Sequence, residues 1–245
     1  MKKSILTLGL AGSLIIVTTG CGGGDDQKEP TAQEVTLEYK TSGTYDLSQY
    51  MAPTENKINN YREKTYEDNQ GGKNYGEPTE AFPTIRFDIN ASTIKEYDSD
   101  GTDTIYTILN DRIKSLDADD NTVDYIVRYA NIGDYIDKTI IETNVNGTSL
   151  NISSLCKLNG HLESKEINNV TYSDIIEISC VSNSNSSGNV GDNNFTTTST
   201  STDTYYLAKE VGEINSIEES CNTTILSGNK VSSCEKIITE ITNIN

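Results

Sequence analysis

Short turns built from Asn, Asp and Gly recur along the chain every 8 to 14 residues, and they constrain its fold more than any other feature. They include Asp100-Gly101, Asn146-Gly147, Asn159-Gly160 and Asn168-Asn169. Such residues tolerate the positive φ angles of two-residue hairpin turns. The segments between them, such as 122–129, are rich in Ile, Val, Thr and Tyr, which favour strands. The pattern predicts an all-β fold, an antiparallel meander forming a curved sheet, half-barrel or sandwich, with long loops and little helix.

Three segments need separate interpretation. Residues 48–61 are the best helical candidate, but Pro53 interrupts them, so we expect a loop with one helical turn. Residues 237–241 are rich in β-branched side chains and are expected to form a final strand. Residues 182–204 are rich in Ser, Thr and Asn, which predicts a flexible polar loop. Strand-like sequence flanks this loop on both sides, so we expect residues 35–245 to form a single β-rich domain.

The first twenty residues have the organisation of a secretory signal peptide. Lys2 and Lys3 precede an uninterrupted apolar stretch of 13 residues, Ile5–Val17. This stretch is too short to cross a bilayer core of roughly 30 Å as a helix, and small residues follow it. We therefore expect residues 1–20 to be removed during export. An ordinary signal peptide with an incidental cysteine is the alternative to the more specific motif that follows.

Thr18-Thr19-Gly20-Cys21 resembles the lipobox of bacterial lipoproteins, with Thr18 where that motif usually has an aliphatic residue. The resemblance implies cleavage before Cys21, diacylation of its side chain and acylation of the new amino group. The acyl chains would anchor the protein on a membrane, and residues 21–34 would form a flexible, glycine-rich and charged tether. If the cell is Gram-negative, Gly22 after the cysteine implies the outer membrane.

The net charge limits the partners of the mature chain. From Cys21 onward the chain carries 37 acidic and 17 basic side chains, a formal charge of −20. Anionic lipid headgroups repel such a domain, so we expect it to stand off the membrane that anchors it. The same charge argues against nucleic-acid binding, because phosphates require a basic face. An envelope protein or a glycan is the expected partner.

Two further segments resemble a pattern in uncharacterised bacterial surface lipoproteins. Tyr172–Ile178 matches their Y-x-D-[IV]-I-E-[IV] strand, and Tyr205–Ile214 matches a Y-Y-x-A-K-G-[VI]-G strand pair, with Glu210 where the pattern has glycine. Tyr45–Pro53 resembles their D-L-x-x-Y-x-x-P entry segment. The resemblance implies no particular activity. It implies that the strands on either side of residues 182–204 belong together.

Four cysteines remain when Cys21 is assigned to the lipid. An exported domain with four cysteines is expected to form two disulfides, for which three connectivities exist. We favour Cys156–Cys180 and Cys221–Cys234, the second because it closes a short hairpin around Ser227-Gly228-Asn229. A redox or metal role is the weaker alternative, because the sequence has no Cys-x-x-Cys motif.

Two acidic clusters are the candidates for a ligand site. Carboxylates stand at alternating positions in both, as calcium sites prefer; the residues are Asp98, Asp100, Asp103, Asp117, Asp119 and Asp120. Neither cluster has the full EF-hand pattern. The alternative is that Asp residues occur there because hairpin turns favour them. No other cofactor is expected.

The single histidine and the absence of tryptophan argue against most enzyme classes. His161 follows Asn159-Gly160 and is expected at the surface, on the shoulder of a hairpin. We therefore expect a lipid-anchored, non-enzymatic lipoprotein of the bacterial cell envelope with a binding or structural role. One alternative is a lipid or lipoprotein carrier with a half-barrel cavity. A second alternative is a secreted hydrolase.

Overall fold

The computed structural model describes residues 31–99, 101, 103–117, 123–145, 148–190 and 193–245. The expected signal peptide, Cys21 and most of the tether lie outside these residues, as do Asp100, Asp119, Asp120 and the Asn146-Gly147 turn. No helix within the described ranges is both long and apolar enough to span a membrane.

The described part of the chain consists mainly of strands. In chain order the elements are β1 (Tyr45–Asp46), the 3-10 turn η1 (Leu47–Gln49), β2 (Lys57–Asp68), β3 (Thr79–Ala81), β4 (Thr84–Asn90), β5 (Thr93–Asp98), β6 (Asp103–Ile108), β7 (Arg112–Asp117), β8 (Val123–Val127), β9 (Tyr129–Ala130), β10 (Tyr135–Val145), β11 (Thr148–Ile167), β12 (Val170–Val190), β13 (Asn193–Ala208), β14 (Gly212–Leu226) and β15 (Asn229–Ile244). The final strand predicted around residues 237–241 is thus confirmed as part of β15.

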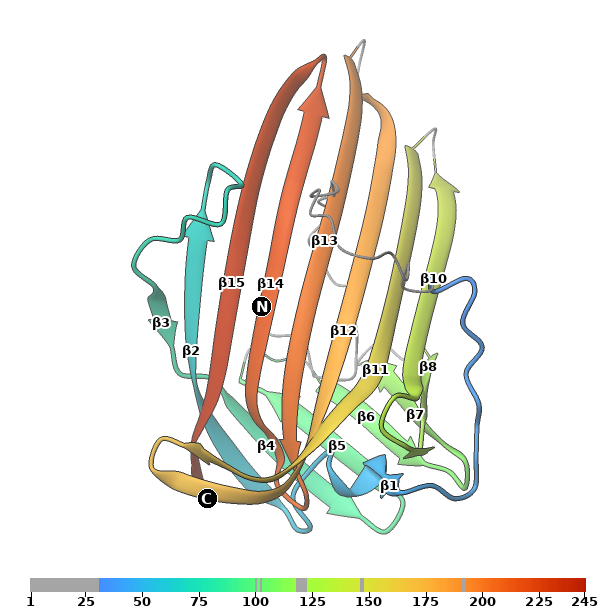
Figure 1. Cartoon of the computed structure of the whole chain (residues 1–245), viewed down its shortest axis with the longest axis vertical. Helices are drawn as coiled ribbons and strands as arrows, with labels where there is room; N and C mark the ends of the chain where they lie inside the picture. Colours follow the sequence, from blue (N-terminus) through green and yellow to red (C-terminus); the bar gives the residue numbers. More distant parts are fainter. Residues whose placement is uncertain (1–30, 100, 102, 118–122, 146–147, 191–192) are drawn as a thin grey trace.

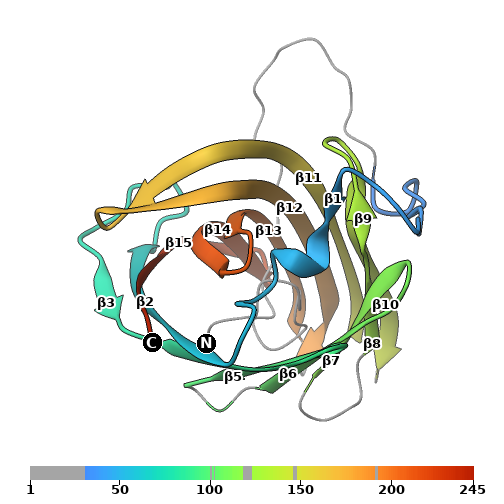
Figure 2. The same ribbon diagram turned by 90° about the horizontal axis from the view of Figure 1, so that it is seen from below.

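Twelve strands form one antiparallel path, in the order β10-β11-β12-β13-β14-β15-β2-β4-β5-β6-β7-β8, and β3 pairs with β2 beside it. The path curls until β10 and β8 lie next to each other, so the sheet is a nearly closed barrel (Figures 1 and 2). Strands β11–β15 are much longer than β4–β8 and rise above them as a single layer (Figure 1). The prediction of an all-β antiparallel curved sheet is confirmed.

The hydrophobic core lies where the lower halves of the long strands face the short ones. Residues 47–52, which we call the plug segment, enter this space and bury Leu47, Tyr50 and Met51. Asp46 positions the plug segment, because it accepts a hydrogen bond from the Ser48 N–H and forms an ion pair with Arg128 at 2.8 Å. The expected helical turn is therefore present as η1, while strand β2 begins four residues before Tyr61.

The prediction of a flexible loop over residues 182–204 is wrong, because these residues form the paired ends of β12 and β13. Ser182 is opposite Ser201, and Val190 is opposite Asn193. Threonine favours strands, and the backbone ladder requires no apolar side chains. Low hydrophobicity therefore indicated only that this part of the sheet has no core beside it. The strands on either side form one hairpin.

The prediction of a hairpin turn at Asn159-Gly160 is also wrong. These two residues lie inside β11, where the register with β12 shifts between Leu158 and Gly160. A glycine within a strand commonly marks such a bulge. The hairpin turn between β11 and β12 is formed by Asn168 and Asn169, whose φ angles are 51° and 65°. His161 consequently lies within a strand and not on the shoulder of a hairpin.

A tight bend joins β13 to β14 without the glycine that the surface-lipoprotein pattern has at position 210. Glu210 adopts a φ angle of 61°, in the left-handed region. Two hydrogen bonds hold the bend: the Glu210 N–H donates to the Gln49 carbonyl at 2.7 Å, and the Val211 N–H donates to the Ala208 carbonyl at 3.1 Å. The first bond attaches the bend to the plug segment. Glu210 therefore pays a steric cost that glycine would avoid.

We expect Glu210→Gly to stabilise the protein by about 0.5–1 kcal/mol, because relief of the left-handed conformation exceeds the extra entropy of glycine in the unfolded chain. Chemical denaturation measures the change. Glu177→Gly, in the middle of β12, is the matched control and should destabilise by about 1 kcal/mol. Equal destabilisation by both substitutions would contradict the prediction.

Candidate functional site

The long strands have two faces of different character. We call the face that carries the core the inner face; Leu158, Ile178 and Tyr205 point to it and are buried. Because residues alternate between faces along a strand, the register assigns the residues above the core as well. The inner face there is lined by hydroxyl groups from β11, β12 and β13. Ser182 donates a hydrogen bond to Ser154 at 2.9 Å, and Ser199 donates to Asn222 at 3.0 Å.

Carboxylates occupy two successive rows of the inner face. In one row Asp203 on β13 is directly opposite Glu218 on β14. In the next row Glu235 on β15 is directly opposite Glu67 on β2. We call these four residues the acidic rows. Like charges directly opposite each other destabilise a sheet, so this arrangement has an electrostatic cost.

Burial and neighbouring carboxylates increase the electrostatic repulsion within the acidic rows. Burial raises the pKa of Glu235, and the nearby carboxylates of Glu67 and Glu63 raise it further. Asp203 is only 7% exposed and accepts a hydrogen bond from the Ser201 hydroxyl. A cation that approaches the inner face here would meet several carboxylates in a partly desolvated setting.

Basic residues of the same strands lie on the opposite, outer face. Arg62 precedes Glu63 and forms an ion pair with Glu240 at 2.7 Å. Lys236 follows Glu235 and is opposite Tyr66 on the outer face. Beside the acidic rows the charged side chains of β2 and β15 that point inward are all acids, whereas the adjacent cations point outward, together with Glu240 and Asp68. The alternation of charge sign along Arg62-Glu63-Lys64 is the sequence signal for this arrangement.

Both disulfides favoured from the sequence are present, one on each face. Cys156–Cys180 joins β11 to β12 on the inner face with a Cα–Cα distance of 4.1 Å. Cys221–Cys234 joins β14 to β15 with the same separation, on the outer face. Each pair is in direct cross-strand register, which is why these connectivities form.

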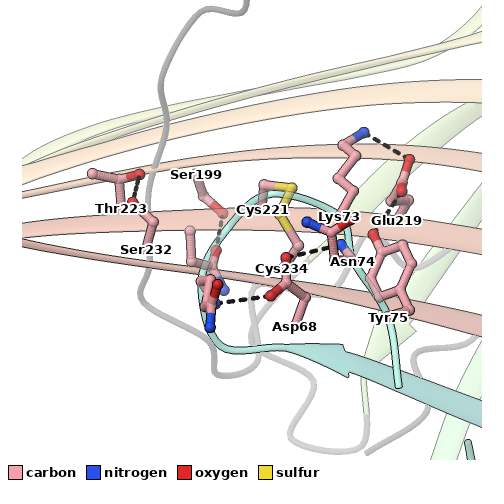
Figure 3. The surroundings of a disulfide bond; sticks show 12 residues. Asp68, Lys73, Asn74, Tyr75, Ser199, Glu219, Cys221, Thr223, Ser232 and Cys234 are labelled. Carbon is pink, nitrogen blue, oxygen red and sulfur yellow. Dashed lines mark hydrogen bonds and ion pairs between the residues drawn. A yellow bond between two sulfur atoms is a disulfide. The ribbon is translucent and has the colours of Figure 1, made fainter. Parts of the chain in front are cut away.

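The outer disulfide lies beneath the segment that follows β2 (Figure 3). Asp68 holds this segment by accepting backbone hydrogen bonds from Gln70 at 2.9 Å and Asn74 at 3.1 Å. Lys73 and Tyr75 both bind Glu219, at 2.8 and 2.6 Å. A Cβ atom at Gly71 would lie 2.5 Å from the Ser232 side chain, so glycine permits the close approach.

His161 belongs to a network that converges on Asp174. One carboxylate oxygen of Asp174 accepts a hydrogen bond from the Tyr50 hydroxyl at 2.8 Å and lies 3.0 Å from His161 Nε2. The other oxygen pairs with Lys209 at 3.3 Å. Burial opposes ionisation of Asp174, but hydrogen bonds from Tyr50, His161 and Lys209 outweigh it and lower its pKa. The network joins the plug segment to β11, β12 and the β13–β14 bend.

This network resembles part of a hydrolytic triad only in its His–Asp pair. Within the described residues no Ser or Thr hydroxyl is hydrogen-bonded to His161. The ring instead stacks on Tyr45, with centroids 5.5 Å apart. A triad acid orients its histidine, whereas Asp174 is shared among three donors. The arrangement supports a structural role.

The calcium candidates gain no support from the described residues. Asp98 ends β5 and Asp103 begins β6; the side chain of Asp117 and the residues Asp100, Asp119 and Asp120 are not described. No group of three or more His, Cys, Asp or Glu in the described ranges could hold a metal ion.

The two best-formed clefts lie beside residues 31–40, which run along the outside of the sheet. Their volumes are about 220 Å³ and 210 Å³. Ile140 and Ile152 line the first together with Glu142 and Asn151, and Glu38 and Asp134 are among the residues that line the second. Pockets for small ligands commonly have volumes of roughly 300–1,000 Å³ and mostly apolar walls. Neither cleft has the form of an acyl-chain site.

No family model matches this sequence, and no curated protein matches it. Among solved structures the chain is similar to OpdO of Pseudomonas aeruginosa, a crystal structure, with 11% sequence identity and a TM-score of 0.13. The likeness covers 79% of this chain and 69% of that chain. A TM-score this low supports no conclusion about fold or function.

We expect Asp174→Asn to destabilise the protein by about 1 kcal/mol near neutral pH, since it weakens bonds to a partly exposed carboxylate. Asparagine accepts the φ angle of 53° found at Asp174, so the backbone is retained. Folding lowers the pKa of Asp174 below its value in the unfolded chain, near 3.8. The ionised carboxylate therefore stabilises the folded protein at pH values above 3.8. This stabilisation is lost as the pH falls through the pKa of Asp174 in the folded protein.

Urea denaturation near neutral pH and in acid, below the unfolded pKa of Asp174, measures both effects. Asp88→Asn is the control, because Asp88 makes only an exposed ion pair with Arg86 at 3.6 Å. A difference between Asp174→Asn and the native protein that persists unchanged in acid would contradict the role of the charge.

Proposed function

We propose that this chain is a membrane-anchored bacterial lipoprotein whose β domain binds a cationic partner on its inner face. The proposed partner is a basic segment of another protein in the cell envelope. The observation that carries the proposal is the pair of acidic rows on the inner face, where the adjacent cations all point outward. Acids that repel one another across the inner face become favourable when a cation lies between them.

The polar lining favours this function over a lipid carrier. An acyl chain requires an apolar surface, whereas the middle strands β12–β14 present mainly Ser, Thr and Asn on the inner face above the core, together with Asp203 and Glu218. The single-layer upper halves of β11–β15 leave the inner face at some distance from the short strands (Figure 1). An extended basic segment could lie across several strands there and meet both acidic rows.

The N-terminal motif and the net charge support the location. A lipidated Cys21 would hold the domain at a membrane, while the charge of −20 would keep its body away from anionic headgroups. Two disulfides are typical of proteins that fold in an oxidising compartment. A partner would then be met in the aqueous part of the envelope.

We expect the detergent-solubilised full-length protein to bind a short oligolysine peptide, and expect oligoglutamate not to bind. Binding should weaken as salt is added, since the contacts are electrostatic. Isothermal titration calorimetry measures both. The double substitution Glu67→Gln with Glu235→Gln should reduce affinity about tenfold, which corresponds to roughly 1.4 kcal/mol.

The matched control removes the same charge elsewhere. Glu80 and Glu163 are exposed residues outside the acidic rows, and Glu80→Gln with Glu163→Gln should leave affinity within about twofold. Equal loss in the two double variants would assign binding to net charge alone and reject the inner face as the site.

The anchor has its own test. Intact-mass spectrometry of the protein from native envelopes should show a chain that begins at an acylated Cys21, and Cys21→Ser should release the protein from the membrane fraction. An unmodified N-terminus at another residue would reject the lipoprotein assignment without affecting the binding proposal.

A further inference from the structure

The two ends of the curled sheet meet at β8 and β10, which we call the seam. Within the described residues no ladder of backbone hydrogen bonds joins these two strands. The side chains of Asp124 on β8 and Asp137 on β10 face each other across the seam on the inner side. Thr139, two residues along β10, places its hydroxyl 3.4 Å from a carboxylate oxygen of Asp124.

Asp137 is buried without a compensating partner. The residue is 1% exposed, and neither carboxylate oxygen accepts a well-formed hydrogen bond from a described residue. Burial raises its pKa to about 8, the charge of Asp124 contributes, and the adjacent Lys138 N–H offsets only part of the shift. Burial likewise raises the pKa of Asp124. A buried, unpaired carboxylate is costly, and two facing each other are more so.

A second, uncharged group points to a ligand at the same place. Ser115 on β7 is directly opposite Asp124 and shares its face. It is 1% exposed, and its hydroxyl has no hydrogen-bond partner among the described residues. Three polar side chains therefore lie on the same face of three successive strands at the seam, and two of them, Ser115 and Asp137, are buried and unsatisfied.

The neighbouring cations are already occupied by other groups. Arg112 stacks on Tyr39, 4.1 Å from the ring centroid, and binds Asp111 at 2.7 Å. Lys138 donates to the Val35 carbonyl at 2.7 Å. Tyr39 lies alongside the pair, and Asp137 and Asp124 contribute to the elevation of its pKa, although burial is the largest cause. Among the described residues, no basic side chain is therefore bound to either of the two carboxylates.

We propose that the seam binds a hard divalent cation, Ca²⁺, between the carboxylates of Asp124 and Asp137 and the hydroxyls of Ser115 and Thr139. All four ligands supply oxygen, which is what Ca²⁺ prefers. The ion would neutralise the facing carboxylates and satisfy the Ser115 hydroxyl. It would also join β8 to β10 where the backbone does not, so the ion would close the sheet.

The site has a defined dependence on pH, because protons compete with the cation. Without a cation, the raised pKa of Asp137 means that its contribution to stability is complete below the unfolded value near 3.8 and is lost as the pH rises through about 8. Ca²⁺ binds the ionised pair, so its affinity and its stabilising effect should increase over the same range.

Terbium luminescence provides a direct test. Tb³⁺ replaces Ca²⁺ at oxygen sites and is sensitised by nearby aromatic rings. The chain has no tryptophan, and Tyr106 is directly opposite Ser115 on the neighbouring strand, so an ion at the seam has a tyrosine nearby to sensitise it. We expect saturable emission from the full-length protein that Ca²⁺ displaces, and a rise in melting temperature with Ca²⁺ that grows from pH 6 toward pH 9.

Substitutions separate this site from the many other carboxylates. Asp137→Asn and Ser115→Ala should each weaken Tb³⁺ binding, the first at least tenfold, and Asp137→Asn should abolish the effect of Ca²⁺ on melting. Asp88→Asn, and the Glu80→Gln with Glu163→Gln variant, should leave both readouts unchanged. Asp137→Asn is expected to fold, because it removes a buried charge and retains the shape.

Two results would overturn the proposal. One is emission that all of these variants reduce equally, which would mean diffuse binding to surface acids. The other is a melting temperature that Ca²⁺ leaves unchanged while Asp137→Asn removes the pH dependence, which would mean that the two carboxylates share a proton instead.

Discussion

The register between the long antiparallel strands determines what each face of this sheet presents. Successive residues alternate between faces, so a slip of one residue would exchange every inner side chain with an outer one. Two cross-strand disulfides oppose that slip, Cys156–Cys180 between β11 and β12 and Cys221–Cys234 between β14 and β15. The acidic rows and the outward-pointing cations depend on this register. Both features would be lost together if it changed.

The turns, the disulfides and the all-β class could be predicted from the sequence, but the length of the long strands could not. Turn residues such as Asn168-Asn169 and the four cysteines act locally, and their roles were predictable from local physics. Residues 182–204 were mistaken for a loop because strands are normally recognised by an apolar face, which a strand beyond the core lacks. Asn159-Gly160 was mistaken for a hairpin because glycine serves turns and bulges equally well.

The candidate sites were less predictable, because each is assembled by contacts between distant segments. Net charge indicated an acidic protein, but only the register placed Glu67 opposite Glu235. Asp124 and Asp137 are 13 residues apart and looked like ordinary strand residues. They become neighbours only when the sheet curls and the strands at its two edges, β8 and β10, meet. The acid that binds His161 was likewise out of reach, because the bulge at Gly160 was read as a turn.

The segment after β2 has a chemical consequence for the bond beneath it. Thiol–disulfide exchange requires an attacking thiolate to reach one of the sulfur atoms. Cys221–Cys234 lies on the open side of the sheet, yet Cys234 is only 3% exposed because Asp68 and the residues after it cover it (Figure 3). The covering segment therefore hinders attack on the Cys234 sulfur, while Cys221 is only half-buried. The outer disulfide is thus shielded at one of its two sulfur atoms, whereas the enclosing strands bury both cysteines of the inner one, so a thiolate meets the outer bond first.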